Sequence, residues 1–85
     1  MIYRLPENNI IHRLSDCKEN AKFTIAKIDL PAKQSAKLDK LGVFEGETIK
    51  IEKKLGKSAL ILNASGAIIA VGREIADKIS VTEAL

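Results

Sequence analysis

The chain has 85 residues and a formal net charge of +3, with 46% apolar and 29% charged residues. This length and composition indicate one folded domain with a small core, and they exclude a disordered chain and a site that encloses a large substrate. The single cysteine excludes an internal disulfide, and no stretch has the roughly 18 apolar residues of a membrane helix, so we expect a cytoplasmic protein without direct membrane insertion.

The first segment, residues 1–13, is expected to be an N-terminal arm, and the domain is expected to cover residues 14–85. The arm contains Pro6 and the polar run Glu7-Asn8-Asn9, which favour irregular structure. An edge strand around residues 10–11 is the alternative.

The first predicted strand of the domain covers residues 22–28, where strand-forming side chains dominate. Its alternation of inward and outward side chains slips between Ile25 and Ile28. Such a slip indicates a β-bulge or a strong bend in the strand.

A helix followed by a double-glycine turn is the most informative segment of the chain. We expect the helix to run from Pro31 to Leu41, because the fixed φ of proline suits a first helical position and its missing N–H costs nothing there. Gly42 suits a left-handed cap just after the helix, and Gly46 suits a turn position with positive φ. The pattern predicts a helix inserted between the first two strands of the domain.

The next strand is predicted at residues 47–53, where the residues alternate and place Ile49 and Ile51 inward. A loop is expected at residues 55–58, which contain a glycine and a serine.

Two further apolar segments, residues 59–62 and 67–71, flank a predicted turn at residues 63–66. They could form one apolar helix, but their β-branched content and the central Asn, Ser and Gly favour two strands. A helical turn at residues 73–77 and a last strand at residues 78–81 follow. The expected fold is mainly β: a small, strongly bent barrel of about five strands that hides its own edges.

The order of these pieces resembles the FeoA-type ferrous iron transport protein A domain from Leu14 to Val81. The core motif of that family appears here as Leu38-x-x-Leu41-Gly42-Val43-x-x-Gly46. The other matching pieces are the opening Leu14-Ser15, the loop Leu55-Gly56, and the ending Ile69-Ala70-Val71 through Ala76 to Ile79-Ser80-Val81.

Two positions depart from the pattern of that family. Asn20 stands where the family has glycine, and Glu45 stands where the family often has proline. Asparagine tolerates left-handed backbone better than other side chains, so we expect the first turn to survive. The second change loosens the turn before Gly46 slightly.

The resemblance implies an SH3-like barrel that is not an enzyme. It also implies a small cytosolic accessory of Fe(II) uptake that docks on the cytoplasmic GTP-binding region of the ferrous iron permease. Two alternatives are a metal-responsive regulatory module, because the same barrel ends iron-dependent transcriptional repressors, and a small barrel that binds nucleic acid. The modest charge and the scarcity of aromatic residues argue against nucleic acid, and a homo-oligomer stays open.

No residue pattern indicates catalysis, a cofactor or a tight metal site. His12 has no nucleophile or carboxylate at a recognisable spacing, and Cys17 is expected to pack as a small apolar side chain. A metal held by these two residues would need at least one or two further ligands. Gly42 and Gly46 lack the Lys-Ser/Thr pair of a phosphate-binding loop.

The helix presents a predicted surface for a partner. Its three lysines fall within about 60° of one another around the helix axis. They form either a solvated face or a basic rim that faces an acidic partner. Leu38 and Leu41 lie roughly a quarter-turn away and are expected to face the core, whereas Phe44 either caps the barrel or is exposed as an anchor. A second basic group is Lys53, Lys54 and Lys57. The predicted partner-binding residues are Lys33, Lys37, Leu38, Lys40, Leu41 and Phe44.

Overall fold

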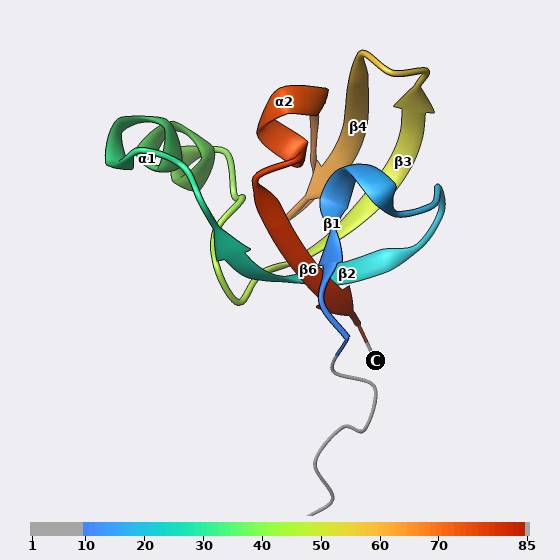
Figure 1. Cartoon of the computed structure of the whole chain (residues 1–85), viewed down its shortest axis with the longest axis horizontal. Coiled ribbons are helices and arrows are strands. Elements are labelled where there is room, and N and C mark those ends of the chain that lie inside the picture. The colour runs from blue at the N-terminus through green and yellow to red at the C-terminus, as the bar shows by residue number, and fades with distance from the viewer. Residues whose placement is uncertain (1–9, 85) are drawn as a thin grey trace, which may run out of the picture.

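The computed structural model describes residues 10–84, which form one antiparallel sheet in the strand order β1-β6-β2-β3-β4-β5 (Figure 1). The strands are β1 (His12–Arg13), β2 (Lys22–Ile28), β3 (Thr48–Leu55), β4 (Ala59–Ala64), β5 (Ala67–Gly72) and β6 (Ile79–Glu83). The helices are the 3₁₀ turn η1 (Leu14–Asp16), α1 (Ala32–Lys40) and α2 (Arg73–Ala76). The predicted irregular segment around Pro6 lies outside the described residues.

The predicted fold class is confirmed: the protein is mainly β, with a helix after an early strand and a short helix before the last strand. The sheet has six strands, because a two-residue edge strand forms at His12–Arg13, directly after residues 10–11, where the alternative edge strand was considered. The prediction that the barrel hides its own edges is wrong within residues 10–84. Only two residues form β1, and their pairing with β6 leaves β1 and β5 as separate edges.

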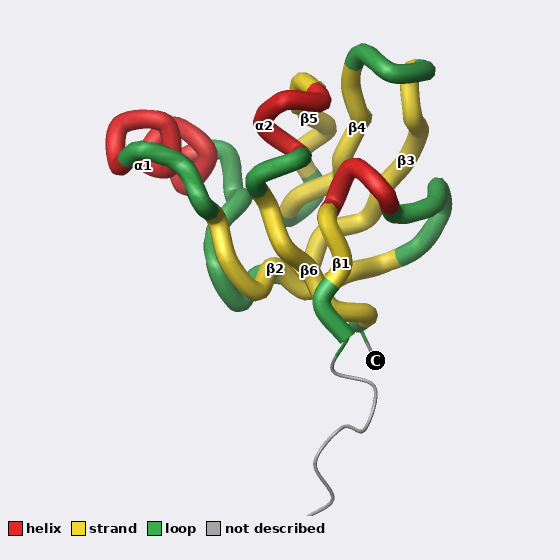
Figure 2. Tube along the Cα trace, in the orientation of Figure 1, coloured by secondary structure: helices red, strands yellow, loops and turns green. Residues whose placement is uncertain are grey.

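Two irregularities bend this sheet around its core (Figure 2). The register between β2 and β6 shifts between Ile25 and Lys27, as the slipped alternation predicted. A second shift, between Ile51 and Lys53, lies where β3 pairs with β4. An extra residue bends a strand and increases its local twist. The two shifts therefore let a short sheet curl around the apolar side chains on its inner face.

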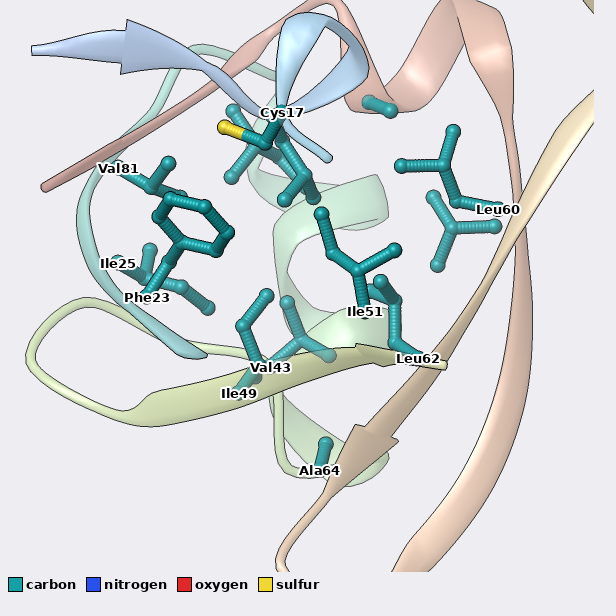
Figure 3. Packing of buried hydrophobic residues seen from close by; sticks show 14 of the residues in the cluster. Cys17, Phe23, Ile25, Val43, Ile49, Ile51, Leu60, Leu62, Ala64 and Val81 are labelled. Atoms are coloured by element: carbon teal, nitrogen blue, oxygen red, sulfur yellow. The ribbon is translucent and has the colours of Figure 1, made fainter. Parts of the chain in front are cut away.

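The core consists mostly of aliphatic side chains, of which ten residues come from the sheet and five come from the helices and turns: Leu14, Cys17, Leu38, Val43 and Ala76 (Figure 3). Ile49 and Ile51 point inward, as predicted, and are 1% and 0% exposed. Phe23 lies beside Val81 near one end, where Cys17 closes the cluster as a small buried side chain. The sequence therefore identified the composition of the core correctly.

The two apolar segments after residue 58 form the hairpin β4–β5 rather than a helix. Its turn is tighter than predicted, because Ala64 still belongs to β4 and only two residues connect the strands. Ser65 and Gly66 have φ values of 54° and 86°, typical of the type I′ turns that match strand twist. The Asn63 Oδ1 atom accepts the Gly66 N–H at 3.0 Å and holds the turn.

Helix α1 begins one residue later than predicted, at Ala32. Pro31 is the N-cap, and its carbonyl accepts the N–H groups of Gln34 and Ser35, both at 3.0 Å. Extended backbone at Pro31, with ψ at 148°, explains the shift, because an N-cap residue has non-helical dihedrals. The predicted tolerance of Asn20 for left-handed backbone is confirmed by its φ of 65°.

The end of α1 is closed by the predicted glycine cap. Gly42 has a φ of 90°, and its N–H donates to the Asp39 carbonyl at 3.0 Å. The Val43 N–H donates to the Leu38 carbonyl at 2.9 Å, which completes a Schellman motif. Gly46, with a φ of 91°, occupies the next turn, where the Glu47 N–H donates to the Phe44 carbonyl at 3.1 Å.

Replacing Gly42 by alanine is expected to destabilise the protein by about 1–2 kcal/mol, because an L side chain at positive φ is strained. The new Cβ would approach other atoms no closer than 3.5 Å, so the cost comes from the backbone. Urea unfolding followed by far-UV circular dichroism measures this loss. The matched control is Gly72→Ala, where φ is −61° and the space is open; an equal loss in both variants would contradict the explanation.

Candidate partner-docking site

Helix α1 projects from the side of the sheet (Figure 1). Of its nine residues, only Leu38 is buried. Isolated helices of this length are marginal in water, so the caps and this one contact must hold α1 in place. Such an element contributes little to the core and leaves most of its surface available.

The structure separates the two leucines that were predicted to face the core. Leu38 is buried, as expected, and this burial removes it from the residues that can reach a partner. The prediction for Leu41 is wrong, because its side chain is 48% exposed. The reason is the helix cap: the chain reverses at Gly42, and Val43, which is 0% exposed, enters the core instead.

An apolar groove of about 330 Å³ lies between α1, the turn that follows it and the end of β2. Phe44 lies at this groove and is 39% exposed, so it serves as an accessible apolar surface rather than as a cap of the core. The lining residues are Ile28, Ala32, Ser35, Ala36, Asp39, Val43, Phe44 and Glu45.

The charged groups that line this groove are both carboxylates. Glu45 accepts the Ile28 N–H through its Oε2 atom at 3.4 Å, a weak contact that leaves the carboxylate exposed. Asp39 lies in the last turn of α1, where a negative charge opposes the helix dipole. The groove therefore combines an apolar floor with a negative rim.

The three predicted lysines of α1 are all exposed, but they do not line the groove. At 100° per residue, Lys33, Lys37 and Lys40 occupy a stripe about a third of a turn from the groove residues of the helix. The second basic group is only partly free, because the Lys54 Nζ atom donates to the Ser15 carbonyl at 3.0 Å. The helix thus offers two neighbouring faces of opposite charge.

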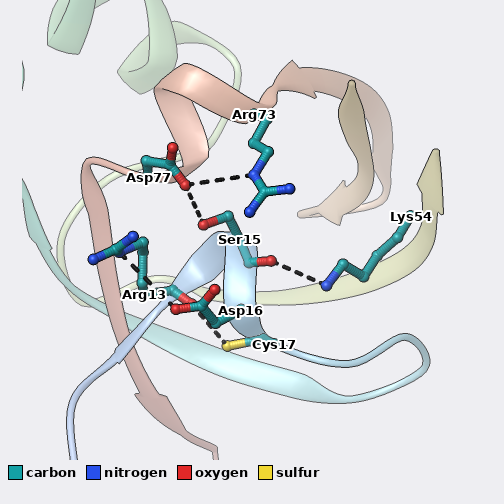
Figure 4. A network of polar contacts seen from close by, with 7 residues as sticks. All are labelled: Arg13, Ser15, Asp16, Cys17, Lys54, Arg73 and Asp77. Atoms are coloured by element: carbon teal, nitrogen blue, oxygen red, sulfur yellow. Dashed lines mark hydrogen bonds and ion pairs between the residues drawn. The ribbon is translucent and has the colours of Figure 1, made fainter. Parts of the chain in front are cut away.

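A polar network joins η1 to α2 and was not predicted from the sequence (Figure 4). Ser15, which is 4% exposed, donates a hydrogen bond from its Oγ atom to Asp77 Oδ1. The Arg73 Nε atom lies 3.9 Å from the same carboxylate oxygen. The spacing of Arg73 and Asp77 is a recognisable helical pair, but nothing in the sequence indicates that Ser15 lies beside them. This network fixes two short elements at one end of the core.

A small hollow of about 190 Å³ brings together His12, Asp16, Cys17 and Glu83, among other residues. Within residues 10–84, no group of three such side chains is placed to hold a metal ion. Burial, and then the nearby Asp16 carboxylate, raise the pKa of the Cys17 thiol from 9.0 to about 11. The thiolate that would ligate a soft metal is therefore disfavoured here.

The raised pKa of Cys17 predicts a loss of stability in alkali. Between pH 9 and about 11 the folded protein keeps the thiol proton that the unfolded chain has lost, so stability is full below this range and falls as pH rises through it. We expect the fall between about pH 8 and about pH 10.5 to be larger in the natural protein than in Cys17→Ala by about 1–2 kcal/mol. Urea unfolding of both proteins at the two pH values tests this, and equal falls would contradict it.

A larger hollow of about 400 Å³ lies on the outer face of β2, β3 and β4. It contains Lys22 and Lys50, but Lys50 lies 3.6 Å from the Glu52 carboxylate. No aromatic side chain lines this hollow, so it lacks the stacking surface of a single-strand nucleic-acid site.

The bent antiparallel sheet, together with the projecting helix α1 and the groove beside it, defines a small β-barrel domain. The chain belongs to the FeoA domain family, whose family model matches residues 12–83. No curated protein sequence matches the chain. Within residues 10–84, no helix has the length and apolar character needed to cross a membrane.

Several solved structures share this fold. An iron uptake regulatory protein (FeoA), solved by crystallography, is 21% identical in sequence, with a TM-score of 0.81. The match covers 88% of this chain and 100% of that chain. FeoA from Chlorobium tepidum is 19% identical, with a TM-score of 0.80, over 87% of this chain and 71% of that one. The IdeR protein of T. acidophilum is 23% identical, with a TM-score of 0.75, over 87% of this chain but only 34% of that one.

The predicted family is thereby confirmed. The FeoA family is non-catalytic and is associated with ferrous iron uptake.

Proposed function

We propose that this protein is a cytoplasmic accessory of Fe(II) uptake that docks on the cytoplasmic GTP-binding region of the ferrous iron permease through α1 and the turn after it. The observation that carries the proposal is the apolar groove beside Phe44 on a helix with one buried residue. Membership of the FeoA family supplies the connection to ferrous iron uptake.

The groove supports a definite partner chemistry. Its apolar floor fits an aliphatic or aromatic side chain of the partner, and Asp39 and Glu45 at its rim favour a lysine or arginine next to that side chain. The lysine stripe on the adjacent face, Lys33, Lys37 and Lys40, favours acidic residues further along the same partner surface. The lysines alone suggested an acidic partner surface, and the groove adds a basic residue beside the apolar side chain of the partner.

Isothermal titration of the full chain with the purified GTP-binding region of the permease tests the docking directly. Saturable one-to-one binding is expected, together with reduced Fe(II) uptake in cells that lack the protein. Absence of binding combined with unchanged uptake would refute the proposal.

Charge reversal separates the groove from the lysine stripe of α1. We expect Glu45→Lys to weaken binding more than Lys37→Glu does, because Glu45 lies at the groove and Lys37 lies on the neighbouring stripe. Rim charges act mainly on the association rate, so stopped-flow kinetics at low salt is the most sensitive readout. A larger effect of Lys37→Glu would place the contact on the lysine stripe instead.

The alternative of a metal-responsive module has a separate test. Equilibrium dialysis of the full chain with Fe(II), Zn(II) and Mn(II) would reveal stoichiometric micromolar binding if the protein sensed metal directly. We expect no such binding, because no group of three potential ligands converges within residues 10–84.

A further inference from the structure

Strand β5 is an edge of the sheet. It pairs with β4 along all six of its residues, and within residues 10–84 no strand pairs with its other side. Proteins usually protect such an edge with charges, proline or a bulge. Here residues 58–72 contain no charged residue and no proline, although 29% of the whole chain is charged. The β4–β5 register is continuous, so this hairpin has no bulge.

The hairpin fixes which backbone groups face outward from this edge. The two-residue turn makes Ala64 and Ala67 a hydrogen-bonded pair, and hydrogen-bonded and non-hydrogen-bonded pairs alternate along an antiparallel ladder. The Arg73 N–H donates to the Ser58 carbonyl at 2.9 Å, as this alternation requires. The N–H and C=O groups of Ile68 and Ala70 and the N–H of Gly72 therefore point away from β4, whereas the Gly72 carbonyl belongs to the N-cap of α2.

We infer that β5 is a self-association site, at which a second copy of this chain adds its own β5 in antiparallel orientation about a two-fold axis at Ala70. In this register Ala70 pairs with Ala70 of the other copy, and each Ile68 pairs with a Gly72. The three pairs supply about four hydrogen bonds, because the Gly72 carbonyl is used as the N-cap of α2. The two sheets join into one continuous sheet.

A second copy fits this edge because the strand is self-complementary. Each copy carries a net charge of +3, and an edge without charges brings two such chains together without placing like charges opposite each other. Ile68, which is 60% exposed, would lie opposite a residue that has no side chain, so its apolar surface could be covered without a clash. The pairing at the axis involves two small side chains.

A cysteine at the axis tests the predicted register. Hydrogen-bonded partners in antiparallel strands lie about 5.5 Å apart between Cα atoms, within disulfide range. We expect Ala70→Cys, in a Cys17→Ala background, to form a disulfide-linked dimer in air. The matched control is Ala26→Cys, which is also an exposed strand alanine but lies in β2, between β6 and β3. Equal cross-linking in the two variants would overturn the inference.

Sedimentation equilibrium tests the association without a cross-link. The natural protein is expected to reach a monomer–dimer equilibrium at concentrations up to about 1 mM. Ala70→Lys places two like charges opposite each other at the axis, and we expect it to raise the dissociation constant at least about tenfold. Unchanged far-UV circular dichroism shows that this variant folds. A natural protein that stays monomeric, or a variant that dimerises equally well, would overturn the inference.

Discussion

Asp77→Ala is expected to lower the free energy of unfolding by about 2 kcal/mol, because it leaves the buried Ser15 hydroxyl without its acceptor. The same substitution also removes the partner of Arg73. The protein has no tryptophan, so urea unfolding followed by far-UV circular dichroism is the suitable measurement.

A double-mutant cycle identifies the cause of this loss. Adding Ser15→Ala to Asp77→Ala removes the orphaned hydroxyl, so we expect the double variant to lose less than the sum of the two single variants. Asp16→Ala is the control, because within residues 10–84 the Asp16 side chain forms an exposed pair with Arg13 at 4.0 Å, and we expect a loss below about 0.5 kcal/mol. Strict additivity would show that the Ser15–Asp77 bond does not carry the effect.

Phe44→Ala is expected to weaken binding to the permease region about thirtyfold, which corresponds to the roughly 2 kcal/mol of an aromatic interface anchor. The fold should survive, because Phe44 is 39% exposed and contributes to the turn through its carbonyl. Isothermal titration gives the affinity, and thermal unfolding of the variant confirms that it folds.

Leu55→Ala is the matched control for Phe44. Leu55 is a similarly exposed apolar residue, at 42%, but it ends β3 and does not line the groove. Its substitution should leave the affinity unchanged. If both substitutions weaken binding equally, the effect comes from general surface hydrophobicity and not from the groove.

The fold followed closely from local patterns in the sequence. Gly42 and Gly46 predicted two positions with positive φ, and the structure has positive φ at both. The slipped alternation of residues 25–28 predicted a β-bulge, which the β2–β6 register contains. These signals are local, because they depend on the backbone preferences of a few adjacent residues. The alternation of Ile49 and Ile51 was informative for the same reason.

The candidate site was less predictable, because it depends on contacts between distant residues. The periodicity of α1 could not show that the cap would bring Val43 into the core and leave Leu41 exposed. The helix pattern likewise gave the lysine stripe, whereas the negative rim of the groove also needs Glu45 from the following turn. The Ser15–Asp77 contact spans 62 residues and has no local signature.

The most direct test of the docking surface is an NMR titration of the isotopically labelled full chain with the permease's GTP-binding region. We predict that amide resonances from Ala32 to Glu45 change most, with smaller changes at the end of β2. Changes concentrated on the outer face of β3 and β4, with α1 unaffected, would contradict the proposed site.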